Sequence, residues 1–391
     1  MKRMLFASAA ALAAVMLPAS ASAQIKIGLI NAYSGQFADT AAQMDNGIKL
    51  YMKQHGDTVA GKKIEIIRKD SGGPNPDVAK RLAQELVVRD KVDILAGFTL
   101  TPEALGAASV SEEAKKLMVV MNAATSIITT KSPYIVRVSL TLPQIADTLA
   151  TWAVKKGGVK KAYTMVSDFG PGVDAEGAFQ KAFKDAGGEI VGSVRMPVAN
   201  PDFSAFVQRA KDLNPESIFL FIPGGAQPAA LGKTFAERGI DPKKVKILST
   251  GEPVDETAIK SMGDIALDRI SAWHYDFNHK SKMNADFVKA FNADYKRNPD
   301  FFAVGGYDGM HLIYEALKKT KGNTDGEALI TAIKGMKWES PRGVIWIDPD
   351  TRDVVQTVYI RKVQKVGNDI LNVEFDKVDN VKDPVKAAMK K

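Results

Sequence analysis

The sequence predicts an α/β protein composed of two doubly wound lobes with mainly parallel sheets. Short apolar runs alternate with helical patterns, and the same rhythm begins again after about residue 142. Alternation of this kind is typical of βαβ units, in which helices cover both faces of a parallel sheet. The 391-residue chain is long enough for two domains. We find no internal sequence repeat, so the two lobes are expected to share architecture only.

The expected elements follow in order along the chain. In the first block, strands are expected at 25–30, 63–67, 92–96 and 118–121, with helices at 41–55, 77–88 and 102–115. In the second block, strands are expected at 161–166, 189–196, 217–221 and 246–248, with helices at 144–156, 175–186, 203–213 and 226–238. The end of the chain adds helices at 283–296, 305–319 and 327–334 and strands at 343–347 and 354–363. Because no Gly/Ser-rich or Pro-rich tether separates the blocks, hinge closure around a ligand is favoured over independent domains.

The N-terminus has the pattern of a secretory signal peptide. Lys2 and Arg3 precede an apolar run over residues 4–17, and Ala21-Ser22-Ala23 provides the small residues of a cleavage site. A membrane anchor is the alternative, but the run is shorter than the ~20 residues needed to span a bilayer. We therefore expect cleavage after Ala23 and a periplasmic protein.

The composition limits the classes of partner and of chemistry. The chain has no cysteine, so disulfides, thiolate chemistry and a lipid-modified cysteine are excluded. The net charge of +8 is modest, and no basic cluster interleaved with aromatic residues indicates nucleic-acid binding. No cofactor is expected, because the first strand leads into Ser34-Gly35 rather than a G-x-G-x-x-G fingerprint. No catalytic residue or metal site is expected either, since no nucleophile–base pair is visible and His274 and His279 have no ligand spacing.

Hydroxyl-bearing loops follow two expected strands of the first block. Thr99 and Thr101 follow one strand, and Ala123 and Thr125 follow the next. Ligands bind outside the carboxyl ends of strands in doubly wound sheets. Hydroxyls and helix N-termini at that edge suit a carboxylate. The alternative is that Thr101 and Thr125 are ordinary helix N-caps.

The second block has comparable loops at its strand ends. Phe169 lies in the run 167–172 and provides a candidate apolar wall. Glu252 lies in a Thr-Gly-Glu-Pro turn and is a candidate partner for a ligand ammonium or hydroxyl. The alternative for Glu252 is a solvated turn residue.

In order and spacing, these motifs resemble the periplasmic leucine/isoleucine/valine-binding proteins of ABC importers, which have the type I periplasmic binding fold. The resemblance covers nearly all of the chain after residue 23 and includes 134–138 and Tyr307-Asp308. It implies three crossovers between lobes, with residues 24–143 plus 273–352 in lobe one and 144–272 plus 353–391 in lobe two. It also implies a membrane permease as partner, and we expect a monomer.

The same resemblance assigns site residues. The family's carboxylate-binding serine corresponds to Thr99 or Thr101, and its alanine carbonyl and threonine correspond to Ala123 and Thr125. Its aromatic wall corresponds to Phe169, and its ammonium-binding acid to Glu252. The mechanism implied is closure of lobe two over a carboxylate held by lobe one.

The ligand beyond its carboxylate is left open. The leading interpretation is a branched-chain or related amino acid, in keeping with Glu252. The alternative is an aromatic carboxylate such as a hydroxybenzoate, because the runs 120–125, 131–137 and 336–343 also resemble a subgroup that binds such acids. A first-loop tyrosine of leucine-type binders is replaced by Thr40, and no cysteines frame the Thr99–Thr101 loop. A ligand sensor and an enzyme on the same scaffold are further, weaker alternatives.

Overall fold

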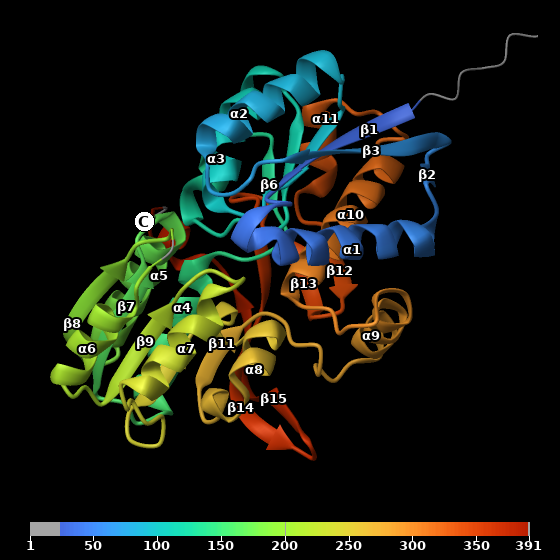
Figure 1. Cartoon of the computed structure of the whole chain (residues 1–391). Helices are drawn as coiled ribbons and strands as arrows, with labels where there is room; N and C mark the ends of the chain where they lie inside the picture. The colour runs from blue at the N-terminus through green and yellow to red at the C-terminus, as the bar shows by residue number, and fades with distance from the viewer. Residues whose placement is uncertain (1–23, 200, 390–391) are drawn as a thin grey trace, which may run out of the picture.

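The computed structural model describes residues 24–199 and 201–389. The expected signal peptide and its cleavage site after Ala23 lie outside these residues. Two α/β lobes meet along one side of the molecule (Figure 1). Within the described ranges, no helix combines the length and apolar character needed to cross a bilayer.

The first sheet has the strand order β2-β3-β1-β4-β5-β6 and is parallel except for β2. Its strands are β1 (Gln24–Asn31), β2 (Thr58–Val59), β3 (Lys62–Asp70), β4 (Ile94–Gly97), β5 (Leu117–Val120) and β6 (Ile135–Arg137). β4, β5 and β6 are buried along their whole length. Continuous apolar burial is expected for strands covered on both faces.

The second sheet has the order β12-β13-β14-β11-β10-β9-β7-β8, and β15 pairs with β14. Its parallel part consists of β7 (Lys161–Ser167), β8 (Glu189–Met196), β9 (Ser217–Phe221), β10 (Lys246–Ser249) and β11 (Ile270–Trp273). Its antiparallel part consists of β12 (Lys337–Ser340), β13 (Gly343–Ile347), β14 (Val354–Val366) and β15 (Asp369–Val381).

Both parallel sheets have the same connectivity. Strands β3-β1-β4-β5-β6 and β8-β7-β9-β10-β11 each follow the order second, first, third, fourth, fifth along their own block. This is the flavodoxin-like order, whose switch point lies between the first and third strands. The prediction of two doubly wound lobes of like architecture is therefore confirmed.

Helices cover both faces of the sheets. They are α1 (Ala38–His55), α2 (Pro76–Gln84), α3 (Thr101–Glu113), α4 (Leu142–Lys155), α5 (Gly170–Asp185), α6 (Ser204–Asp212), α7 (Gln227–Glu237), α8 (Glu256–Met262), α9 (Lys282–Tyr295), α10 (Phe301–Lys319), α11 (Gly326–Ile333) and α12 (Pro384–Met389). α10 packs directly on α1 although the two are distant in sequence. A Cβ atom at Gly47 would lie 1.9 Å from the Ala303 carbonyl oxygen, so glycine is required at this close helix contact.

The chain passes between the two lobes three times. It leaves the first sheet after β6, returns after β11 to place α10 against α1, and enters the second sheet again at β12. β12 and β13 are hydrogen-bonded to β14 and thus extend the second sheet, whereas α10 and α11 pack with the first lobe. The expected limits of the lobes, 24–143 plus 273–352 and 144–272 plus 353–391, remain a prediction.

Candidate functional site

The carboxyl ends of the two parallel sheets face each other where the lobes meet (Figure 1). All six predicted site residues lie in loops or helix starts that follow strands: β4, β5, β7 and β10. The loop after β4 is conformationally unusual, because Gly97 has φ +100° and Phe98 has φ +67°. A non-glycine residue with positive φ is found mostly where the surroundings over-determine the backbone, often at functional sites.

Two of the predicted hydroxyls meet directly. The Oγ1 atoms of Thr101 and Thr125 lie 2.9 Å apart, and both residues are buried. Neither side chain acts as a helix cap: Thr101 is already the first residue of α3, and Thr125 precedes a 3₁₀ turn without a side-chain cap bond. The N-cap alternative is therefore wrong for Thr101. Thr125 occupies the N-cap position of its turn but does not cap it through its side chain, and the two hydroxyls form one polar patch.

Thr99 is directed elsewhere. Its hydroxyl donates to Oδ1 of Asn31 at 3.1 Å and accepts from the backbone N–H of Ala32 at 3.3 Å. Thr99 thus supports the loop after β1. Of the two threonines considered for the same role, the structure brings Thr101, and not Thr99, to Thr125.

The loop that contains Ala123 and Thr125 is held by a buried arginine, which the sequence analysis did not single out. Arg137 in β6 donates from Nη1 to the carbonyl oxygens of Ala123 at 3.1 Å and Thr125 at 2.7 Å. Its Nε and Nη2 atoms donate to Oδ1 of Asp353 at 2.9 and 2.7 Å. Asp353 is 216 residues away in sequence, so no local sequence pattern indicates this pair.

Lobe two contacts the threonine patch through the start of α5. A Cβ atom added to Gly170 would lie 2.7 Å from Oγ1 of Thr125 and 3.3 Å from Cγ2 of Thr101. The preceding residue, Phe169, is half-buried and its ring stacks on Phe221, with centroids 6.1 Å apart. The lobes are therefore closed on each other at the predicted site.

Glu252 is buried, so the alternative that it is a solvated turn residue is wrong. Its Oε2 atom has no hydrogen-bond partner among the described residues. Burial, and to a smaller extent the neighbouring Asp255, raise the pKa of this carboxyl well above its usual range. Such a group favours its protonated form until a cation or a polar ligand group approaches.

Other buried polar atoms near the carboxyl edge of the second sheet also lack partners in the described structure. They are the hydroxyls of Ser167, Ser249 and Thr250, Nε1 of Trp273 and Nδ1 of His274. Burial is the main cause that lowers the pKa of His274, so its imidazole is neutral. Buried polar groups are normally hydrogen-bonded, and each exception calls for an explanation. A cluster of exceptions at strand ends is what a polar ligand site requires.

Buried acids lie beside this cluster. Asp255, the N-cap of α8, and Asp300, the N-cap of α10, belong to the two sides of the junction. Burial raises the pKa of Asp255 to about 7 and that of Asp300 to about 8, and the Asp255 carboxyl adds to the rise at Asp300. Across the described ranges, no group of three or more His, Asp or Glu side chains is arranged to hold a metal ion.

Sequence comparison identifies relatives over most of the chain. The family model described as "Periplasmic binding protein" matches residues 24–368. The Leu/Ile/Val-binding protein homolog 6 of Brucella melitensis is 41% identical over 363 residues, which cover 92% of this chain and 93% of that protein.

Structure comparison gives the same result. A solute-binding protein of an ABC transporter from Rhodopseudomonas palustris BisB5, in complex with 3,4-dihydroxybenzoic acid, is 53% identical with a TM-score of 0.90. The match covers 93% of this chain and 99% of that one. A second such protein, from R. palustris HaA2 in complex with p-hydroxybenzoic acid, is 40% identical with a TM-score of 0.90 and coverages of 93% and 100%. The chain therefore belongs to the periplasmic binding protein family, as a solute-binding protein of the ABC-transporter type.

Proposed function

We propose that this protein captures a hydroxylated aromatic acid, of the hydroxybenzoate class, between its lobes. The observation that carries the proposal is the set of buried, unpartnered and uncharged polar groups at the edge of the second sheet, opposite the Thr101–Thr125 patch. The carboxylate binds to that patch in lobe one, and ring hydroxyls satisfy the groups in lobe two. This reverses the order of the two ligand classes given by the sequence, in which an amino acid came first.

The roles of the predicted residues follow from this arrangement. Thr101 and Thr125 donate hydroxyls to the carboxylate, and the 123–126 loop shapes the pocket around it. Phe169 packs on the ring, and the neutral Glu252 exchanges a hydrogen bond with a ring hydroxyl. Thr99 acts through the loop after β1 rather than by contact.

Closure is driven by the ligand. A ligand shifts the equilibrium only by its differential affinity for the closed state. Residues from both lobes must therefore contact the acid, which a ligand with polar groups at both ends allows. We further propose that the protein works as a periplasmic monomer after export and delivers its ligand to a membrane permease without chemical turnover. The family membership and the complexes of the relatives support this role.

A branched-chain amino acid is the second candidate, and a specific observation favours it. An α-ammonium would pair with the free Oε2 of Glu252, and the 41% identical relative has a leucine/isoleucine/valine-binding name. The cost is that Glu252 must ionise while buried beside Asp255.

A ligand screen separates the two candidates. Thermal shift and calorimetry with 4-hydroxybenzoate, 3,4-dihydroxybenzoate, benzoate and leucine are expected to show the tightest binding for the hydroxylated acids. A ligand at a hundredfold excess over Kd stabilises by about 2.7 kcal/mol. Benzoate is the matched control, since a site built to hydrogen-bond a hydroxyl rejects the analogue that lacks one. Glu252→Gln is expected to keep hydroxybenzoate binding, because an amide still bonds a hydroxyl. Binding of leucine, lost in Glu252→Gln, would instead establish the amino-acid function.

Thr125→Ala is expected to weaken binding of the acid without unfolding the protein. Removal of one partner of a buried hydrogen bond costs about 1–3 kcal/mol, which is roughly a five- to 150-fold loss of affinity. Calorimetry measures the loss, and circular dichroism verifies the fold. Thr130→Ala is the control, because Thr130 is exposed and its hydroxyl donates only to the Ile127 carbonyl. Equal affinities in the two variants would remove Thr125 from the site.

A further inference from the structure

The last described residues, 382–389, form a short segment that we term the C-terminal strap; it comprises Lys382, Asp383 and α12. The strap lies near the junction of the two lobes, beside α5 (Figure 1). Among the residues of α12, Lys386 is the buried one, with 5% of its surface exposed. Lysine is almost never buried unless it is paired. The strap is therefore anchored by a charge rather than by an apolar side chain.

The anchor belongs to a network that reaches the 123–126 loop. Nζ of Lys386 donates to Oγ1 of Thr129 at 2.6 Å and pairs with Oδ2 of Asp353. The other oxygen of Asp353 accepts from Arg137, which in turn donates to the carbonyls of Ala123 and Thr125. Lys386, Asp353 and Arg137 are all nearly fully buried. Loss of one charge from such a network leaves another unpaired, so its members fix each other's positions.

A second link joins the strap to the same loop. Oγ of Ser126 donates to Oδ2 of Asp383 at 2.5 Å. The backbone N–H of Ser126 donates to Oδ2 of Asp174 at 2.7 Å, and Asp174 belongs to α5 of the second lobe. Ser126, which follows Thr125 directly, is thus held by the strap and by the facing lobe together.

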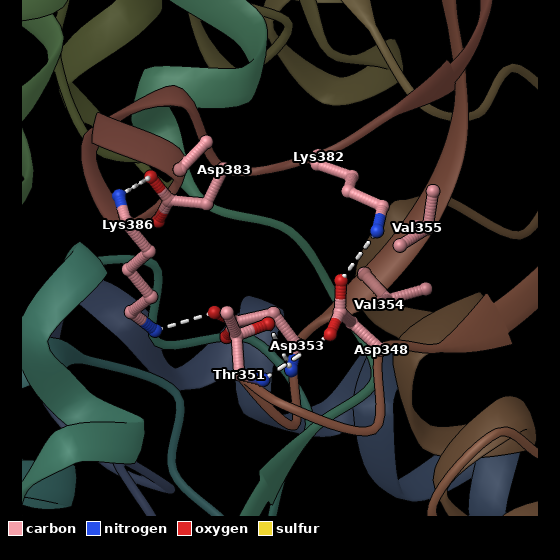
Figure 2. Close-up of a pocket in the computed structure, with 9 residues that line it drawn as sticks. Asp348, Thr351, Asp353, Val354, Val355, Lys382, Asp383 and Lys386 are labelled. Atoms are coloured by element: carbon pink, nitrogen blue, oxygen red, sulfur yellow. Dashed lines mark hydrogen bonds and ion pairs between the residues drawn. The ribbon is translucent and has the colours of Figure 1, made fainter. Parts of the chain in front are cut away.

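The strap also borders a pocket. This pocket of about 180 Å³ is lined by the strap and by the turn and strand start at residues 348–355. Figure 2 shows Lys382 and Lys386 reaching from the strap to different acids, Asp348 and Asp353. Of the two lysines, Lys386 is the one that connects through Asp353 to Arg137 and the 123–126 loop, whereas Lys382 pairs with Asp348.

We propose that the C-terminal strap positions the 123–126 loop for its ligand, with Lys386 as the positioning residue. Lys386 fixes Asp353, Asp353 fixes Arg137, and Arg137 fixes the carbonyls that flank the ligand-facing Thr125. Asp383 adds a direct bond to the loop. The inference rests on the proposed function in one respect: both require that the 123–126 loop contacts the ligand.

The first test needs no ligand. Lys386→Met removes the ammonium while keeping an unbranched side chain of similar reach. Hydrogen exchange of the ligand-free protein is expected to become faster in the amides of 123–130 and to stay unchanged elsewhere in the first lobe. Lys382→Met is the matched control, because it removes the same charge four residues earlier, from a half-exposed side chain that pairs with Asp348 and not with Asp353. Unchanged exchange in Lys386→Met, or equal acceleration in both variants, would overturn the proposal.

The second test measures affinity for 3,4-dihydroxybenzoate by calorimetry. Lys386→Met is expected to weaken binding by about two- to thirtyfold, the range of coupling through packed networks. Lys382→Met is expected to bind with the affinity of the parent protein. Lys386→Arg, which keeps the positive charge, is expected to recover most of the affinity lost in Lys386→Met. A merely structural role of Lys386 would not require this recovery. If Lys386→Met does not fold, Asp383→Asn replaces it with a smaller expected loss; it weakens the bond to Ser126 and keeps an amide oxygen for the backbone N–H groups of Val385 and Lys386. If the parent protein binds none of the acids, the proposed function fails. The hydrogen-exchange experiment then still tests whether the strap positions the 123–126 loop.

Discussion

Replacement of Gly170 by alanine is expected to lower ligand affinity by about five- to 150-fold while both lobes remain folded. The added Cβ would lie 2.7 Å from Oγ1 of Thr125, a residue of the facing lobe. Overpacking of this kind costs about 1–3 kcal/mol. Because the contact exists only where the lobes meet, the cost falls on the closed state and leaves the open state unaffected. A penalty on the closed state alone reduces apparent affinity by the corresponding factor.

Calorimetry with 4-hydroxybenzoate measures the loss, and small-angle scattering reports the open and closed populations. Gly177→Ala is the matched control in the same helix, because a Cβ at Gly177 would contact nothing within 4 Å. That variant is expected to bind normally and to gain stability of up to about 1 kcal/mol from helix propensity. Parent-like affinity in Gly170→Ala would show that closure over the ligand does not bring α5 against Thr125.

Much of the fold could be predicted because local patterns encode it. The buried parallel strands are short apolar runs, and the long helices alternate with them. The strand β15 was missed because its sequence is polar and most of its residues remain half-exposed or exposed. It is a strand only because β14 provides a pairing edge along its whole length. β6, at three residues, was too short to stand out from its surroundings.

The candidate site could be predicted only as a set of loops. Strand ends and small hydroxyl residues located Thr101, Thr125 and Glu252, since topology places such loops at one edge of a sheet. The choice between Thr99 and Thr101 depended on side-chain direction, which spacing does not encode. Arg137 was missed because its partner, Asp353, comes from a distant crossing segment. Trp273 ends, and His274 follows, a strand that the sequence analysis did not predict, β11.

The run 336–343, which resembles the subgroup that binds aromatic acids, lies at the chain crossings. Trp338 donates from Nε1 to Oδ1 of Asp308 at 3.2 Å, and Ser340 donates to Oδ2 at 2.8 Å. Arg342 donates from Nε to the same Oδ2 at 3.0 Å, and from Nη1 to the Ser139 carbonyl at 2.7 Å. Ser139 belongs to the first crossing between the lobes, so the arginine ties two crossings together.

Arg342→Met is accordingly expected to destabilise the protein by about 3–5 kcal/mol, because it leaves Asp308 buried without its cation. Urea unfolding measures the change as a lower midpoint at an unchanged slope. Arg81→Met, which breaks the exposed pair with Glu85, is expected to cost only about 0–1 kcal/mol.

A double variant, Arg342→Met with Asp308→Asn, tests the cause of this loss. Replacement of both partners removes the stranded charge, so the double variant is expected to be more stable than Arg342→Met alone. An Arg342→Met protein as stable as Arg81→Met would mean that the crossings do not depend on this pair. A double variant less stable than either single one would mean that Asp308 acts through Trp338 and Ser340, whose hydrogen bonds an amide reproduces only in part.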